Sequence, residues 1–96
     1  MNEFAALTHA IGEYTVEALG KDNLNALQVV ANERELSAFI EIALNDPSDV
    51  AQRAAIATMI EVEEMYSGEI VLTYVFVDEI GDLEDVNASQ LQYSYA

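Results

Sequence analysis

Hydrophobic residues near the start of the chain recur at steps of three and four. Over residues 3–19 the apolar stripe comprises Phe4, Leu7, Ile11, Tyr14 and Ala18. Glu3, Glu13 and Glu17 fall off that stripe, so the spacing predicts an amphipathic helix with one buried face. Gly20 suits the left-handed position that commonly ends a helix.

The pattern over residues 24–44 is less regular. Apolar positions 24, 27, 30 and 31 fit a helix, although residues 27–30 also fit a short strand. Asn32 followed by Glu35 matches a capping box, which opens a helix. We therefore expect a break near Asn32 and then a second helix that extends to Leu44.

Residues 46–49 (Asp-Pro-Ser-Asp) are the clearest boundary signal in the chain. They predict a third helix that is capped by Asp46, has Pro47 in its first turn, and runs to about Tyr66. Ser67 and Gly68 would end it.

The period then changes to two. Residues 70–77 are β-branched or aromatic apart from Leu72 and predict a strand with two largely apolar faces. Ile70, Leu72, Tyr74 and Phe76 share the face expected to meet the helices. The other face is expected to meet a partner chain or another helix, and its residues are a candidate oligomer interface: Val71, Thr73, Val75 and Val77.

Residues 90–95 alternate apolar and polar side chains and predict a second strand. We expect it to pair antiparallel with residues 70–77, with Tyr74, Tyr93 and Tyr95 packed across the hairpin. The predicted fold is therefore a single α+β domain, residues 1–96, with about three N-terminal helices followed by an antiparallel β-hairpin.

The net charge of the chain is the feature that bears most on its function. The chain has 18 acids and three bases, Lys21, Arg34 and Arg53, and a net charge of −15. From Ala54 to Ala96 there are nine acids and no base. Solubility alone requires a charge magnitude of only about 2–8 in a small domain. The sign opposes direct binding to nucleic acid or anionic lipid, so charge would select a basic protein partner.

Helix capping and the helix dipole account for the acids at predicted helix starts: Glu3, Asp22, Glu33, Glu35, Asp46 and Asp49. The remaining groups lie where charge is unfavourable, and no nearby base is expected to offset them. Glu13 and Glu17 form a like-charge pair, and three glutamates lie at the negative end of the third helix. Rows of carboxylates a few ångströms apart resemble a phosphate backbone, so we predict a partner-binding surface comprising Glu61, Glu63, Glu64, Asp78, Glu79, Asp82, Glu84 and Asp85, with Glu13 and Glu17 as a second patch.

In size, charge and lack of catalytic residues, the whole chain resembles the small acidic counter-defence proteins of phages, the DNA-mimic anti-restriction and anti-CRISPR proteins. No motif is matched, so no residue role is transferred. The resemblance implies a non-enzymatic inhibitor that acts in the host cytoplasm on a basic, nucleic-acid-binding host protein, such as a CRISPR effector or a restriction enzyme.

Other interpretations remain open. Halophilic adaptation also produces acid-rich chains, and an acidic surface can keep an apolar, oligomer-forming protein soluble. The main alternative is a structural or assembly protein, a homodimer or larger homo-oligomer joined through residues 70–77.

The sequence contains few candidates for a catalytic or metal-binding site. His9 is the single histidine, which argues against a catalytic triad, and there is no cysteine. Residues 78–85 fail the EF-hand pattern because Ile80 and Gly81 occupy the wrong positions. We expect no enzyme activity, cofactor or metal. The start resembles no signal peptide, and no apolar run is long enough to span a membrane.

Overall fold

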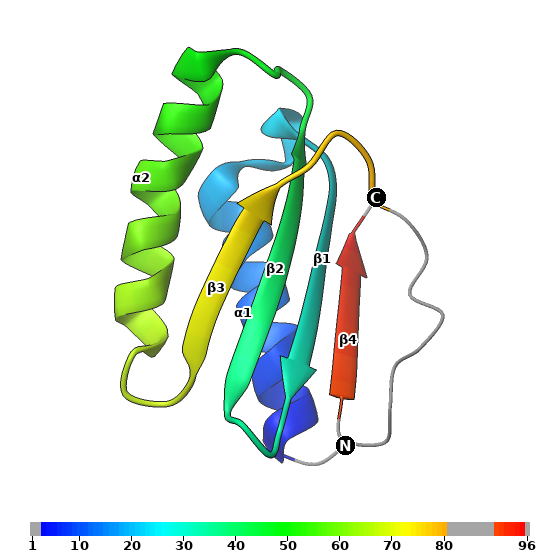
Figure 1. The fold of residues 1–96 in the computed structure, drawn as a ribbon, viewed down its shortest axis with the longest axis vertical. Helices are drawn as coiled ribbons and strands as arrows, with labels where there is room; N and C mark the ends of the chain where they lie inside the picture. The colour runs from blue at the N-terminus through cyan, green and yellow to red at the C-terminus, as the bar shows by residue number, and fades with distance from the viewer. Residues whose placement is uncertain (1–2, 81–89, 96) are drawn as a thin grey trace.

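The computed structural model shows a four-stranded mixed sheet with two α-helices (Figure 1). It describes residues 3–80 and 90–95. The elements are α1 (Glu3–Leu19), a short 3₁₀ helix η1 (Lys21–Asn23), β1 (Leu24–Asn32), β2 (Ser37–Leu44), α2 (Asp49–Tyr66), β3 (Val71–Phe76) and β4 (Gln90–Tyr95). The strand order is β3-β2-β1-β4. The predicted α+β class is confirmed, whereas the predicted three helices and C-terminal hairpin are wrong.

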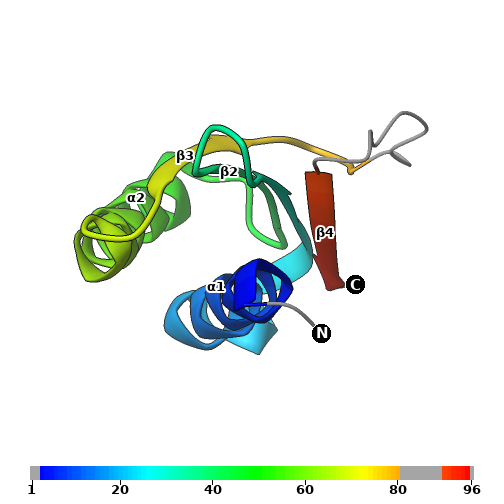
Figure 2. The ribbon, with the colours of Figure 1, turned by 90° about the horizontal axis from the view of Figure 1, so that it is seen from below.

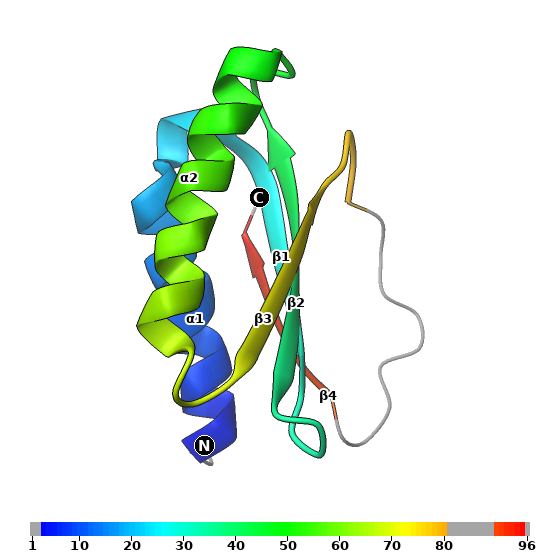
Figure 3. The same cartoon turned by 60° about the vertical axis from the view of Figure 1, so that its left-hand side comes forward.

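Both α-helices lie on the same face of the sheet. Figures 2 and 3 show both helices on one side of the sheet, α1 next to β1 and β4 and α2 next to β3, with no described helix on the opposite face. The core lies between these two layers. Its fully buried side chains include Ile11, Leu27, Val29, Ile40, Ile42, Met59 and Val62. As predicted, β3 turns Leu72 toward this core and Val71 away from it, with exposed fractions of 6% and 64%.

Residues 24–44 form two antiparallel strands rather than a helix, so the helical interpretation is wrong and the strand alternative for residues 27–30 is correct. Burial follows a period of two: Leu27 and Val29 on β1, and Ile40 and Ile42 on β2, enter the core. Because these side chains gain their burial only from sheet pairing, tertiary packing overrides the weak helical pattern.

The capping-box signal at Asn32 marks a β-turn. The Asn32 Oδ1 atom accepts a hydrogen bond from the Glu35 backbone N–H at 3.2 Å, as a helix cap would. The chain then turns back through Leu36, whose φ is +50°, and enters β2. The local hydrogen bond is common to both structures, so it could not distinguish them.

The two C-terminal strands do not pair with each other. β3 lies parallel to β2 at one edge of the sheet, reached by the crossover through α2, while β4 lies antiparallel to β1 at the other edge. The predicted packing of Tyr74 against Tyr93 and Tyr95 is therefore wrong. The Tyr74 ring contacts Phe76, and the Tyr93 ring contacts His9 of α1.

Helix ends follow the predicted signals with one shift. α1 has the predicted bounds, and Gly20 after it has a φ of 94°. The N-cap of α2 is Ser48 rather than Asp46, because the Ser48 hydroxyl accepts from the Ala51 backbone N–H at 3.2 Å. Asp46 instead accepts from the Ser48 N–H at 2.9 Å, and Pro47 precedes the cap. The predicted end of this helix at Tyr66 is confirmed.

Candidate functional site

The acids are distributed unevenly between the sheet and the rest of the fold. Three of the 18, Asp82, Glu84 and Asp85, lie outside the described residues. Of the other fifteen, Glu41 is the one that lies on a strand; the rest belong to helices and connections. All fifteen are exposed except Glu41 and Glu63, which are half-buried. The helices and connections therefore form the anionic surface, and the strands are nearly uncharged.

The acids predicted to bind a partner form two separate groups. Glu61, Glu63 and Glu64 lie in the last turns of α2, next to the start of β3. Asp78 and Glu79 follow the far end of β3, a strand of six residues that spans about 20 Å. Figure 1 shows this opposition, since α2 descends and β3 returns upward. The described part of the predicted set is thus not one face.

The acids of α1 have basic neighbours, contrary to the expectation that none would offset them. Glu13 forms an ion pair with the imidazole of His9 when that ring is protonated, and Glu17 Oε1 lies 3.6 Å from Lys21 Nζ. Both pairs are exposed and one helical turn apart, so each contributes only a few tenths of a kcal/mol, roughly 0.3–0.5. These are the ion pairs found among the described residues.

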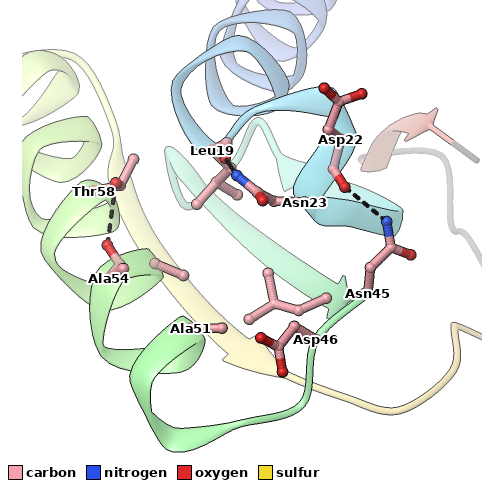
Figure 4. A pocket seen from close by; sticks show the side chains of 10 residues that line it. Leu19, Asp22, Asn23, Asn45, Asp46, Ala51, Ala54 and Thr58 are labelled. Carbon is pink, nitrogen blue, oxygen red and sulfur yellow. Dashed lines mark hydrogen bonds between the residues drawn. The ribbon is translucent and has the colours of Figure 1, made fainter.

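A cavity of about 390 Å³ opens at the end of the molecule where α1 ends and α2 begins (Figure 4). It is lined by Leu19, Asp22, Asn23, Leu44, Asn45, Asp46, Ala51, Ala54, Ala55 and Thr58. Asn45 ties its walls together, because its Nδ2 donates to the backbone oxygens of Asp22 and Leu24 at 3.0 and 3.2 Å. The cavity thus joins two parts of the chain that are distant in sequence: α1 with η1, and the end of β2 with α2.

A second hollow, of about 320 Å³, shares Leu44 and Asn45 with the first and brings in Asp78. Five acids therefore collect at this end of the fold, which we call the acidic end: Asp22, Asp46, Asp49, Asp78 and Glu79. Sequence reasoning had assigned the first three to helix capping and the last two to a binding loop. Their grouping depends on the parallel β2–β3 pairing, which the predicted hairpin excluded.

We call the sheet face opposite the helices the open face. Part of the predicted oligomer interface lies on it. Val71 and Val75 are 64% and 38% exposed, and Thr73 lies exposed between them. Val77 lies beyond β3 and is half-buried. The structure adds Phe39 of β2, which is 42% exposed and paired in register with Thr73. Phe39 was missed because its segment was predicted to be a helix.

Gln28 of β1 also lies on the open face, in register with Glu41 and Ser94, yet it is only 4% exposed. Among the described residues, its Oε1 atom has no hydrogen-bond partner. A buried acceptor without a partner destabilises a fold, so this position is one where stability has not been maximised.

The pKa values of Tyr66 and Tyr93 are raised, mainly because burial disfavours the phenolate; Glu69 adds to the effect at Tyr66 and Glu13 at Tyr93. Both tyrosines therefore stay protonated and neutral over the physiological range. Within residues 3–80 and 90–95, no three His, Cys, Asp or Glu side chains gather as metal ligands would.

No protein-family model, curated protein or solved structure matches this chain. In the part of the chain that the structure describes, no helix has both the length and the apolar character that crossing a membrane requires.

Proposed function

We propose that this chain is a non-enzymatic inhibitor that binds a basic nucleic-acid-binding surface of a host defence protein, such as a CRISPR effector or a restriction enzyme. The observation that carries the proposal is the lack of internal neutralisation. Thirteen of the fifteen described acids are exposed, and only Glu13 and Glu17 have ion-pair partners among the described residues. A surface of this kind repels nucleic acid and attracts the proteins that bind it.

The mechanism is competition for the lysines and arginines that grip phosphates. On α2, Glu61 and Glu64 are three residues apart, which places them about 4.5 Å apart along the helix axis. This spacing is close to that of phosphates along a strand, about 3.4 Å in axial rise. A basic groove that binds these carboxylates releases its own counterions, so association is fast and weakens with salt.

Charge reversal in a DNA-cleavage assay tests this function. The wild-type protein should slow cleavage of duplex DNA by a restriction nuclease or CRISPR effector of its host, and excess DNA should restore the rate. The double variant Glu61→Lys with Glu64→Lys should inhibit at least tenfold less well.

Its matched control is Glu33→Lys with Glu35→Lys on the β1–β2 turn, which changes the net charge equally. The control should retain most of the inhibition. Equal loss in both variants would show a nonspecific charge effect and would contradict a defined acidic binding surface.

A homo-oligomeric assembly protein is the second candidate, favoured by the exposed apolar side chains of the open face. Val71, Val75 and Phe39 lie on adjacent strands, and Glu41 is the single acid on the described strands. Two copies that each carry −15 repel least where carboxylates are fewest. The double variant Val71→Lys with Val75→Lys distinguishes the candidates. Sedimentation should show that these substitutions dissociate an oligomer joined through the open face, whereas the DNA-cleavage assay should show that an acidic inhibitor remains active.

A further inference from the structure

The cavity at the acidic end has an apolar floor that the surrounding core does not fill. Leu19 of α1 and Leu44 of β2 form two sides, and α2 contributes Ala51, Ala54 and Ala55. Figure 4 shows Leu19 on one side of the hollow and Ala51 and Ala54 of α2 on the other. Because the three alanines of α2 present only methyl groups here, the two helices leave a space that longer side chains would close.

The polar rim of the cavity offers hydrogen-bond acceptors and few donors. The Asn45 Nδ2 donates to the Asp22 and Leu24 carbonyl oxygens, and the Asn23 Nδ2 donates to the Leu19 carbonyl oxygen at 2.8 Å. The Thr58 hydroxyl donates to the Ala54 carbonyl oxygen at 3.2 Å. Apart from one N–H of Asn23, the side-chain donors of the rim are therefore already used within the protein.

Two acids, Asp22 and Asp46, also line the cavity, and Figure 4 shows their carboxylates pointing away from each other. A ligand that carries several N–H donors and a positive charge is the chemistry that such a rim favours.

The start of α2 does not reverse this preference. A helix N-terminus attracts anions, but here the Ser48 hydroxyl already accepts from the Ala51 N–H, and the carboxylates of Asp46 and Asp49 flank the terminus. Neither base of this region, Lys21 or Arg53, lines the cavity, and Lys21 is paired with Glu17.

We infer that this cavity receives a lysine or arginine side chain of the protein partner, with its aliphatic stem on the apolar floor and its cationic head at the carboxylate rim. A volume of about 390 Å³ suits one long side chain and its neighbouring backbone. The inference rests on the proposed function, because it assigns to the basic partner an anchor residue and the place where that residue docks.

Titration of the full-length, ¹⁵N-labelled chain with the peptide acetyl-Gly-Arg-Gly-amide tests this anchor site. The amides of Leu19, Asn23, Ala54 and Thr58 should shift together and saturate. The corresponding Lys peptide should bind at the same amides, whereas the Leu and Glu peptides should not. Saturable binding of the Leu peptide at these amides would overturn the inference, since the rim would then select no charge.

Variants separate the cavity from the general negative field. Asp22→Asn with Asp46→Asn should weaken Arg-peptide binding about tenfold, because charge-assisted hydrogen bonds are lost. Glu33→Gln with Glu35→Gln removes the same charge from the distant β1–β2 turn and should change binding less than twofold. Ala54→Leu, which fills the cavity with a good helix former, should abolish the shifts.

The two proposals fail separately. Shifts spread over all acidic surfaces, equally reduced by both charge variants, would overturn the cavity assignment and leave an acidic inhibitor intact. Saturable binding in the cavity by a protein that inhibits no nucleic-acid-binding partner would uphold the anchor site and remove the proposed target class.

Discussion

The helix side of the molecule and the open face of the sheet differ in both charge and apolar exposure. The helices carry seven exposed or half-buried acids: Glu3, Glu13, Glu17, Asp49, Glu61, Glu63 and Glu64. The described strands carry Glu41 alone, and three large apolar side chains on the open face, Val71, Phe39 and Val75, are between 38% and 64% exposed.

Under the proposed function, this difference suits the two surfaces to different kinds of partner. The helix side and the acidic end can attract a basic protein from a distance, and the open face can bind only by contact, through apolar area. An anionic chain that bound a second copy through its helices would bring like charges together. We therefore propose that hetero-association uses the acidic surfaces and that any self-association uses the open face.

Substitutions at two adjacent residues of β2 should give the largest difference in stability between the two faces of the sheet. Ile40 is fully buried under the helices, and Phe39 is 42% exposed on the open face. Ile40→Ala should lower the free energy of unfolding by about 2–5 kcal/mol, because it leaves a core cavity. Phe39→Ala should lower it by about 1 kcal/mol or less. Urea unfolding followed by circular dichroism measures both; equal losses would mean that the open face is covered in solution.

The packing of β4 against α1 depends on Gly12. A Cβ atom at this position would overlap the Tyr93 ring of β4, so Gly12→Ala should lower the free energy of unfolding by about 1–3 kcal/mol. Gly68→Ala is the matched control, because an added Cβ there meets nothing within 4 Å. Hydrogen exchange of the β4 amides should increase in the first variant only; unchanged β4 protection would contradict this packing.

Gln28 is a position on the open face where a substitution should increase the stability of the fold. Gln28→Leu removes a buried acceptor that has no partner and should raise the free energy of unfolding by about 1 kcal/mol. Gln92 is the control, because it is exposed and lies on β4, the strand that pairs with β1. Gln92→Leu should change the free energy of unfolding by no more than about 0.5 kcal/mol. A stabilised variant that loses partner binding would instead give Gln28 a role in recognition.

Two tyrosines give the helix side a pH dependence above neutrality. Burial raises the pKa of Tyr66 and of Tyr93, so the unfolded chain loses these protons first as the pH rises. Their contribution to stability is complete below about pH 10 and is lost above it. The double variant Tyr66→Phe with Tyr93→Phe should flatten the alkaline fall in thermal midpoint relative to its own value at pH 7. An unchanged slope would contradict this linkage.

Elements with a strong local signal could be predicted from the sequence. The apolar stripe of residues 3–19, the β-branched run of residues 70–77 and the alternation of residues 90–95 each gave the observed element. Residues 24–44 could not be assigned locally, because the choice between helix and strand depends on neighbours that bury Leu27, Val29, Ile40 and Ile42.

That one error also concealed much of the candidate site. Without β2 at the centre of the sheet, residues 70–77 and 90–95 were predicted to pair with each other. The acidic end and its cavity arise from long-range pairing of β1, β2 and β3, which no local spacing encodes. The exposed side of β3, in contrast, followed directly from its period of two.

Affinity purification of partners from the native host is the most direct test of the central claim, that the acidic surface occupies a nucleic-acid-binding protein. The wild-type chain should retain a specific basic protein, and excess duplex DNA or high salt should each release it. The variant Glu61→Lys with Glu64→Lys should fail to retain that protein, whereas Val71→Lys with Val75→Lys should retain it. A partner that is indifferent to DNA and salt, and is lost from the open-face variant instead, would contradict the account.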